Sequence, residues 1–114
     1  MELSLVHRSN NETLVHMAGD MDALGCAYAR QTLEKIALEG GQGTLVLDLE
    51  KVGFLDSSGI GAISFLLKQL KLSGGELRII NVNGQPRELV KLVGLHRAIS
   101  VEWGRDEAEN RAAS

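Results

Sequence analysis

The sequence GFLDSSGIGAI, residues 53–63, joins a hydrophobic strand to a helix with apolar periodicity. Three polar residues, Asp56, Ser57 and Ser58, stand in a row at this junction. The first turn of a helix exposes its side chains and leaves backbone N–H groups free to meet whatever docks there. A serine at this position is therefore a candidate nucleophile, a candidate helix cap or a candidate site of phosphorylation.

Strands and a helix are predicted upstream of the junction. Two strands around Leu3–His7 and Thr13–Ala18 are expected to form a hairpin. Gly19–Asp22 is expected to end the second strand and start a helix that runs from Ala23 to Glu39, with Asp22 as its N-cap. The nearly continuous apolar run Thr44–Leu49 is typical of a central strand that is buried on both faces.

Downstream of the junction the same alternation continues. A helix is expected to reach about Leu72, and a strand at Glu76–Ile80, a helix from Gln85 to Gly94 and a last strand at Ala98–Val101 follow. The residues predicted to form the core stripe of the first of these helices are Ile60, Ile63, Leu66, Leu67 and Leu70.

The resulting order, β-β-α-β-α-β-α-β, predicts an α/β fold with a mixed sheet. Strands that are separated by helices pair in parallel through right-handed crossovers, whereas the N-terminal hairpin adds an antiparallel strand. The helices are expected to pack on this sheet. A chain of 114 residues is one domain, which is expected at residues 1–103 and followed by a polar tail at 104–114.

Composition narrows the classes of function. A net charge of −3 gives no basic field for nucleic acid, and no apolar run approaches the roughly 20 residues that span a bilayer. The N-terminus does not have the pattern of a signal peptide. A single cysteine, Cys26, forms no internal disulfide, which fits a reducing compartment. We therefore expect a cytoplasmic protein that does not insert into a membrane.

Catalytic chemistry finds little support in the sequence. The histidines, His7, His16 and His96, are not tied by spacing to the serines at the junction, so a nucleophilic serine lacks a predicted base. His16 with Asp20 and Asp22 could be drawn as a metal cluster, but strand alternation does not make these residues converge. The glycine-rich segment at 40–43 precedes a strand instead of following one, which argues against a phosphate-binding loop. We expect no catalytic residue, metal or cofactor.

A docking surface is the other interpretation of the junction. One oxygen suffices for a helix cap, yet three candidate groups stand in a row. The side of the helix opposite the core stripe carries Gly61, Phe65, Lys68 and Leu72. A bare Gly61 beside Ala62 lets another backbone approach closely, and an exposed Phe65 offers an anchor. These features favour a binding surface with a modifiable group at its edge.

The sequence resembles the single-domain STAS proteins, and among them the bacterial anti-sigma factor antagonists. The matching segments are Gly19–Asp22 before the first helix, Leu45–Leu49 in the central strand and Phe54–Gly61 at the junction. Gly74–Leu77 and Val90–Leu95 are similar to the family's later strand and helix. The resemblance covers the chain up to the polar tail and implies the STAS fold.

This resemblance implies a phosphorylation switch. In the family, a serine kinase with the histidine-kinase-like ATP-binding fold also acts as the anti-sigma factor, and it phosphorylates the serine directly after the aspartate, here Ser57. A PP2C-type phosphatase reverses the modification. The unphosphorylated protein binds the kinase and so releases its client, whereas phosphorylation abolishes binding. Asp22 matches an acidic position beside the modified serine, and Asp20 stands where the family usually has Glu.

The expected partner-binding surface surrounds Ser57. Its predicted members are Asp22, Asp56, Ser58, Gly59, Gly61, Ala62, Phe65 and Lys68. Three alternatives remain open at this stage. The chain could be a non-enzymatic STAS subunit of a membrane lipid-transport ATPase complex. It could be a partner-switching protein that regulates secretion or biofilm formation and not a sigma factor, or it could be a scaffold component of a larger signalling assembly.

Overall fold

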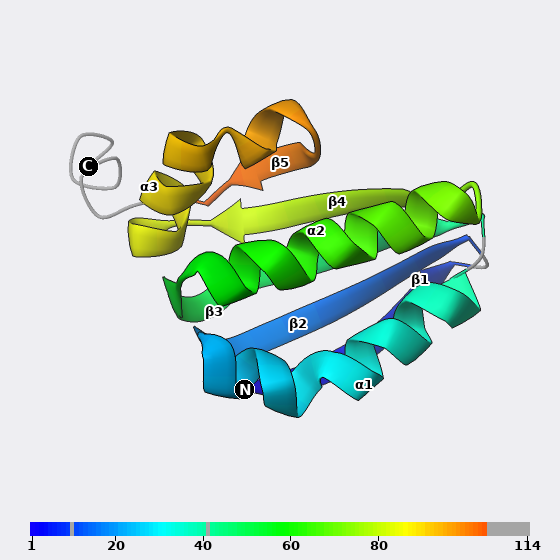
Figure 1. Cartoon of the computed structure of the whole chain (residues 1–114). Coiled ribbons are helices and arrows are strands. Elements are labelled where there is room, and N and C mark those ends of the chain that lie inside the picture. The colour runs from blue at the N-terminus through cyan, green and yellow to red at the C-terminus, as the bar shows by residue number, and fades with distance from the viewer. Residues whose placement is uncertain (10, 41, 105–114) are drawn as a thin grey trace.

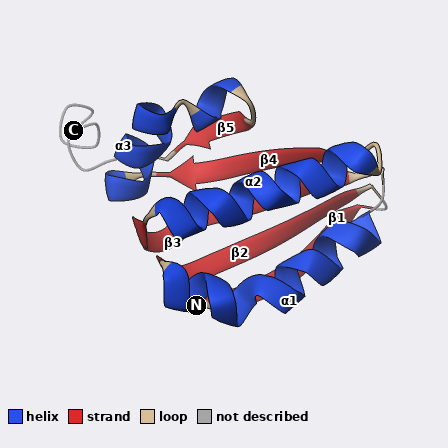
Figure 2. Cartoon of the chain, in the orientation of Figure 1, coloured by secondary structure: helices blue, strands red, loops and turns tan. Residues whose placement is uncertain are grey.

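The computed structural model describes residues 1–9, 11–40 and 42–104 (Figure 1). These residues form one five-stranded sheet, three α-helices and a short 3-10 helix (Figure 2). The strands are β1 (Glu2–Ser9), β2 (Glu12–Met21), β3 (Thr44–Leu55), β4 (Glu76–Val82) and β5 (Ser100–Trp103). The helices are α1 (Ala23–Gly40), α2 (Ser57–Leu72), α3 (Gly84–Val93) and the 3-10 helix η1 (Leu95–Arg97).

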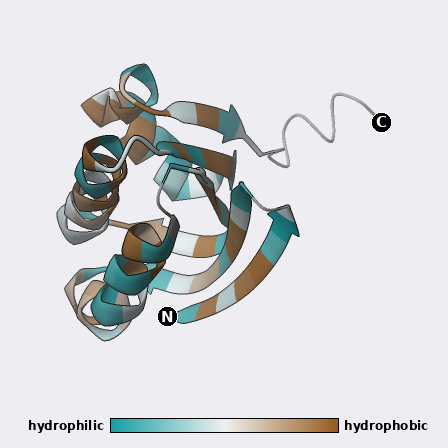
Figure 3. Ribbon diagram, turned by 90° about the vertical axis from the view of Figure 1, so that its right-hand side faces the viewer, coloured by the Kyte–Doolittle hydropathy of each residue, from teal (hydrophilic) through white to brown (hydrophobic). Residues whose placement is uncertain are grey.

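The sheet has the strand order β1-β2-β3-β4-β5. β1 is antiparallel to β2, and every later neighbour pair is parallel. Because successive parallel strands lie next to one another, right-handed crossovers are expected to place the connecting helices on one face of the sheet. Figure 3 shows helices gathered on one side of the sheet. The predicted α/β fold, its mixed sheet and its element order are confirmed.

The core lies between the sheet and these helices. In α2 the buried residues are Gly59, Ile63, Leu66 and Leu70. Ile60 and Leu67, which the sequence placed on the core stripe, are only partly buried against it. A stripe at helical spacing is wider than the line of contact between one helix and a sheet, so its outer members stay at the margin.

The adjacent strands β2 and β3 are both longer than the sequence predicted. β3 continues to Leu55, six residues beyond the predicted end, because β2 pairs with it along that length. β4 pairs with β3 only as far as Asp48, opposite Ile80. The second half of β3 is therefore flanked by one parallel strand instead of two and loses the continuous apolar pattern. β2 likewise passes through Gly19, whose φ of 111° accompanies a shift in register, and ends at Met21.

The C-terminal part of the described chain differs slightly from expectation. The last strand begins at Ser100 instead of Ala98, because the N–H groups of Ala98 and Ile99 both donate to the carbonyl of Leu95 and extend the turn of η1. Gly104, the first residue of the predicted tail, is buried, and its N–H donates to the Val82 carbonyl at 2.8 Å. Residues 105–114 of that tail lie outside the described residues.

Candidate functional site

Two helices begin side by side at one edge of the sheet. β2 and β3 are adjacent parallel strands and end in register, with Met21 opposite Leu55. Each strand is followed by an aspartate and then by a helix, Asp22 before α1 and Asp56 before α2. The N–H of Asp56 donates to the Met21 carbonyl at 3.3 Å, which ties the two turns together. The fold therefore brings together two acidic turns that are 34 positions apart in the sequence.

Asp56 is the N-cap of α2. Its carboxylate oxygen Oδ1 accepts from the backbone N–H of Ser58 at 2.8 Å and from that of Gly59 at 3.3 Å. This arrangement satisfies two of the N–H groups that a helix start leaves without an intrahelical partner. The cap is thus supplied by the aspartate, and neither serine hydroxyl is needed for it.

Asp22 plays the same part for α1, as the sequence predicted. Its Oδ1 accepts from the Gly25 N–H at 2.8 Å, and its carbonyl accepts from the Cys26 N–H at 2.9 Å. The pKa of the Cys26 thiol is raised, first by burial and then by the negative charges of Asp56 and Asp22. Both capping carboxylates therefore act on the same side chain, which makes this edge of the domain locally negative.

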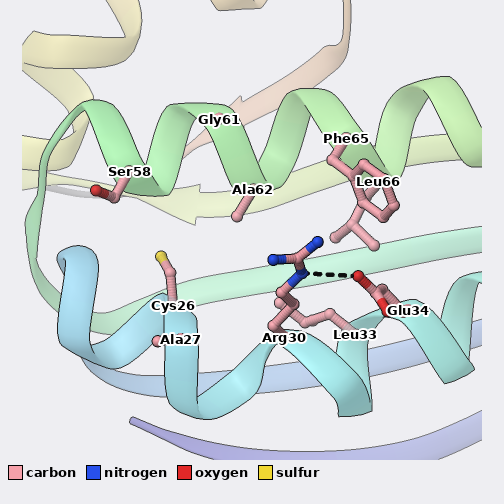
Figure 4. Close-up of a pocket in the computed structure, with 10 residues that line it drawn as sticks. All are labelled: Cys26, Ala27, Arg30, Leu33, Glu34, Ser58, Gly61, Ala62, Phe65 and Leu66. Atoms are coloured by element: carbon pink, nitrogen blue, oxygen red, sulfur yellow. Dashed lines mark hydrogen bonds and ion pairs between the residues drawn. The ribbon is translucent and has the colours of Figure 1, made fainter.

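The two serines differ in exposure. Ser57, the first residue of α2, is exposed, whereas Ser58 is half-buried and lines a groove between α1 and α2. Figure 4 shows the Ser58 side chain at the end of this groove that lies nearest the helix starts. Of the two hydroxyl groups, that of Ser57 is the one more accessible from solvent.

The groove has a volume of about 300 Å³ and runs along both helices (Figure 4). It is lined by Cys26, Ala27, Arg30, Leu33 and Glu34 of α1 and by Ser58, Gly61, Ala62, Phe65 and Leu66 of α2. The lining is mainly apolar, with a charged pair on the α1 side, where Arg30 Nε donates to Glu34 Oε1 at 2.9 Å. The Phe65 side chain is 40% exposed at the wall contributed by α2.

Two glycines of α2 have opposite surroundings. A Cβ on the buried Gly59 would meet a Leu55 methyl carbon and, at 2.7 Å, the Met21 carbonyl oxygen. Gly59 therefore allows α2 to start close against the ends of β2 and β3. A Cβ on Gly61 would meet no atom within 4 Å, so the domain itself does not require glycine there. Gly61 leaves a strip of bare backbone at the groove.

The predicted partner-binding residues fall into four places in the structure. Ser58, Gly61, Ala62 and Phe65 line the groove, and the two aspartates cap the helices beside it. Lys68 lies elsewhere, in a shallow depression that Leu72 also lines. Gly59 is buried against Leu55 and the Met21 carbonyl, so its prediction as a surface contact is wrong.

The sequence interpretation missed the contribution of α1 to the groove. Arg30 and Glu34 are one turn apart on that helix and face α2 together with Cys26. Their spacing of four residues gives a signal that they share a face. Which helix lies beside that face depends on the strand order, which the local sequence does not reveal.

The histidines have partners away from the junction. His16 Nδ1 lies 2.8 Å from Asp48 Oδ2 in the middle of β2 and β3, and the His96 ring packs against Trp103 with centroids 5.7 Å apart. His7 Nδ1 lies 3.5 Å from the Thr13 hydroxyl in the hairpin. None of these contacts pairs an imidazole with Ser57 or Ser58.

These features describe an α/β domain with a capped, serine-bearing helix start at the carboxyl edge of its sheet. Residues 3–109 match the model of the STAS domain family, and the chain belongs to that family. The anti-sigma-B factor antagonist of Bacillus subtilis (strain 168) is 28% identical over 96 residues, which cover 84% of this chain and 86% of the relative.

Solved structures share the fold at lower sequence identity. An anti-sigma-factor antagonist (STAS) domain protein from Planctomyces limnophilus aligns with a TM-score of 0.77 at 17% identity, covering 98% of both chains. The Bacillus cell fate determinant SpoIIAA in its phosphorylated form aligns with a TM-score of 0.67 at 19% identity, again covering 98% of both. The resemblance to STAS proteins that the sequence indicated is confirmed. In the described part of the chain, no helix is long and apolar enough to cross a membrane.

Proposed function

We propose that this chain is an anti-sigma factor antagonist of the partner-switching type, a non-enzymatic cytoplasmic protein whose phosphoacceptor is Ser57. Its partner is a serine kinase of the histidine-kinase-like ATPase fold, and a PP2C-type phosphatase restores the unmodified state. The observation that carries the proposal is the division of roles at the start of α2, where Asp56 makes the cap and Ser57 stays exposed.

Phosphorylation of Ser57 is compatible with the folded domain. A phosphate at the first position of a helix is favoured by the helix dipole and by nearby N–H groups, so α2 is expected to stay intact. The modification adds a charge of about −2 directly after Asp56 and close to the edge that Asp22 already makes negative. A partner would have to desolvate this charge, and the binding free energy falls as a result.

The groove between α1 and α2 supplies the rest of the docking surface. It begins at Ser58, beside the acceptor serine, and its exposed Phe65 is an apolar anchor of the kind that dominates interface energetics. Gly61 allows a partner backbone to approach α2 closely. The unphosphorylated protein binds its kinase through this surface, and the kinase then releases its client.

Phosphate mapping tests the assignment of the acceptor. The chain is incubated with Mg-ATP and its cognate kinase, and the modified peptide is identified by mass spectrometry. Wild-type protein and the Ser58→Ala variant are expected to carry phosphate on Ser57, whereas Ser57→Ala is expected to carry none. Phosphate on Ser58 in the wild-type protein would contradict the assignment. An unmodified chain that copurifies stably with a transport ATPase would support a transporter subunit instead.

A further inference from the structure

A side chain from α3 completes the end of β3. The amide of Gln85 makes two hydrogen bonds with the backbone of Leu55. Its Oε1 accepts from the Leu55 N–H at 2.8 Å, and its Nε2 donates to the Leu55 carbonyl oxygen at 2.8 Å. One glutamine amide thus serves both backbone groups of the residue that immediately precedes the α2 cap, as a neighbouring strand would.

The sheet leaves these two groups without a strand partner. β4 pairs with β3 only as far as Asp48, so the later part of that edge of β3 has no β4 residue opposite it. The N–H of the next residue, Asp56, points the other way and donates to Met21 on the β2 side. Successive residues of a strand direct their hydrogen-bonding groups to opposite sides of the strand. The N–H and carbonyl of Leu55 therefore point to the side where β4 no longer pairs with β3. Backbone groups at such positions need a partner.

The chain that follows β4 brings Gln85 to this gap. Asn81 has a φ of 59°, and the pairing of β4 with β5 shifts register around it. Gly84, with a φ of 58°, then starts α3, and Gln85 follows as its second residue. After β4 the backbone therefore turns away from β3, and the Gln85 side chain takes the place of a neighbouring strand beside Leu55.

Leu55 is coupled to the acceptor turn in two ways. It is covalently joined to Asp56, whose carboxylate caps α2. Its buried side chain also packs against Gly59, where a Cβ would collide with it. A displacement of Leu55 would be passed both to the cap and to the first turn of α2. The position of Ser57, which lies between these two contacts, depends on both.

We propose that Gln85 is a positioning residue for the acceptor site, because its amide fixes Leu55 and thereby the turn that presents Ser57 to the kinase. The part of this proposal that concerns Ser57 rests on the proposed function. The two hydrogen bonds between the Gln85 amide and the Leu55 backbone, called the clamp below, do not rest on the proposed function. They can be tested without any kinase.

Two substitutions separate hydrogen bonding from shape. Gln85→Met keeps the length of the side chain and removes both hydrogen bonds. Gln85→Glu, when ionised, replaces the donor to the Leu55 carbonyl by an anionic oxygen, which repels that carbonyl oxygen. The side chain is therefore expected to turn away and to lose the hydrogen bond from the Leu55 N–H as well. Gln31→Glu, the same chemical change at an exposed position of α1, is the matched control. Each variant is first shown to be folded by circular dichroism, and backbone amide exchange is then measured by NMR.

At pH 7 the protection factor of the Leu55 amide is expected to fall about tenfold in Gln85→Met and Gln85→Glu, and to be unchanged in Gln31→Glu. The introduced carboxyl group is expected to have a raised pKa, since only its protonated form can donate to the Leu55 carbonyl. Protection in Gln85→Glu should therefore return as the pH falls below about 5, while that in Gln85→Met stays low. Wild-type protein measured at each pH is the control for effects of pH that do not involve residue 85, including those of the charged neighbours along the chain, Asp56, Arg87 and Glu88.

The kinase readout then tests the link to Ser57. At pH 7, kcat/KM for phosphorylation is expected to be at least about fivefold lower for Gln85→Met than for wild type, with Gln31→Glu unaffected. An unchanged Leu55 protection factor, or no recovery at low pH in Gln85→Glu, would overturn the clamp. A lost clamp with unchanged kcat/KM would overturn the positioning role. If wild-type protein is not phosphorylated at all, the proposed function fails while the exchange data still decide the clamp.

Discussion

At the scale of single residues, the two glycines of α2 separate packing from recognition. Gly59 lies against Leu55 and the Met21 carbonyl, whereas Gly61 faces open space. We expect Gly59→Ala to lower the free energy of unfolding by roughly 1–3 kcal/mol through overpacking. Gly61→Ala is expected to raise it by about 0.5–1 kcal/mol, because alanine is the better helix former. Urea denaturation of the two variants measures both changes.

The open position of Gly61 also provides a test of the proposed docking surface. Gly61→Ala is expected to weaken kinase binding even though the domain becomes more stable, because the added methyl group occupies the bare strip beside the groove. Titration of the kinase with wild type and Gly61→Ala measures this effect. A variant that is more stable and binds with undiminished affinity would show that the partner does not approach α2 at this point.

The pKa of Cys26 reports on the negative charges of Asp22 and Asp56 at the starts of α1 and α2. Burial raises the pKa of its thiol, and the charges of Asp56 and Asp22 raise it further. A higher pKa means less thiolate at a given pH, so alkylation by iodoacetamide at pH 8 should be slower than for an unstructured cysteine peptide. Asp56→Asn removes one of the charges and should shift the pH profile of alkylation toward lower pH. It should not restore the peptide rate, because burial is the larger cause. An unchanged pH profile in Asp56→Asn would contradict this account.

At the scale of secondary-structure elements, the groove between α1 and α2 is the proposed docking surface, and a pair of phenylalanine variants tests it. Phe65 at the groove and Phe54 on β3 are 40% and 41% exposed, so they form a matched pair. Phe65→Ala is expected to weaken kinase binding about 10- to 100-fold, as removal of an interface anchor does. Phe54→Ala is expected to leave binding unchanged.

Stability measurements on the same pair provide the control. Each phenylalanine is partly exposed, so each alanine variant should lose only about 1 kcal/mol of the free energy of unfolding. If Phe65→Ala instead lowers the melting temperature by many degrees, this side chain contributes to the core. Its effect on binding would then reflect a damaged domain and would say nothing about the groove.

The helix starts could be predicted from the sequence, whereas the full length of β3 and the contact between α3 and β3 could not. The helix starts at Asp22 and Asp56 are predictable because a capping residue and an apolar stripe are local signals. The full length of β3 is not, because its second half is paired on one side by β2 and carries no continuous apolar run. The hydrogen bonds from Gln85 to Leu55 span 30 residues and depend on the turn out of β4, so no local pattern indicates them.

At the scale of the whole molecule, the order of the strands explains why the candidate site exists. Adjacent parallel strands end at the same edge of a sheet, so β2 and β3 deliver two helix starts and two aspartates to one place. The alternation of strands and helices predicted parallel strands joined by helices, which the structure confirms, but it did not predict which strands are neighbours. The contribution of α1 to the groove could not be predicted, because it requires knowing that α1 and α2 are neighbours.

The architecture also favours a switch that works without a change of fold. The helix cap is made by Asp56, and the first turn of α2 is packed through Gly59. A phosphate on the proposed acceptor, Ser57, is therefore expected to displace neither contact. We expect the modified and unmodified proteins to have the same circular dichroism spectrum. The difference between them should appear in the affinity for the partner.

The most direct test of this account is the affinity of the kinase for the protein before and after phosphorylation of Ser57, measured by isothermal titration calorimetry. Ser57→Ala serves as a permanently unmodified control. The phosphorylated protein is expected to bind about 10²- to 10³-fold more weakly than the unmodified protein, and Ser57→Ala should bind as tightly as unmodified wild type. Equal affinities for the phosphorylated and unphosphorylated forms would contradict the account.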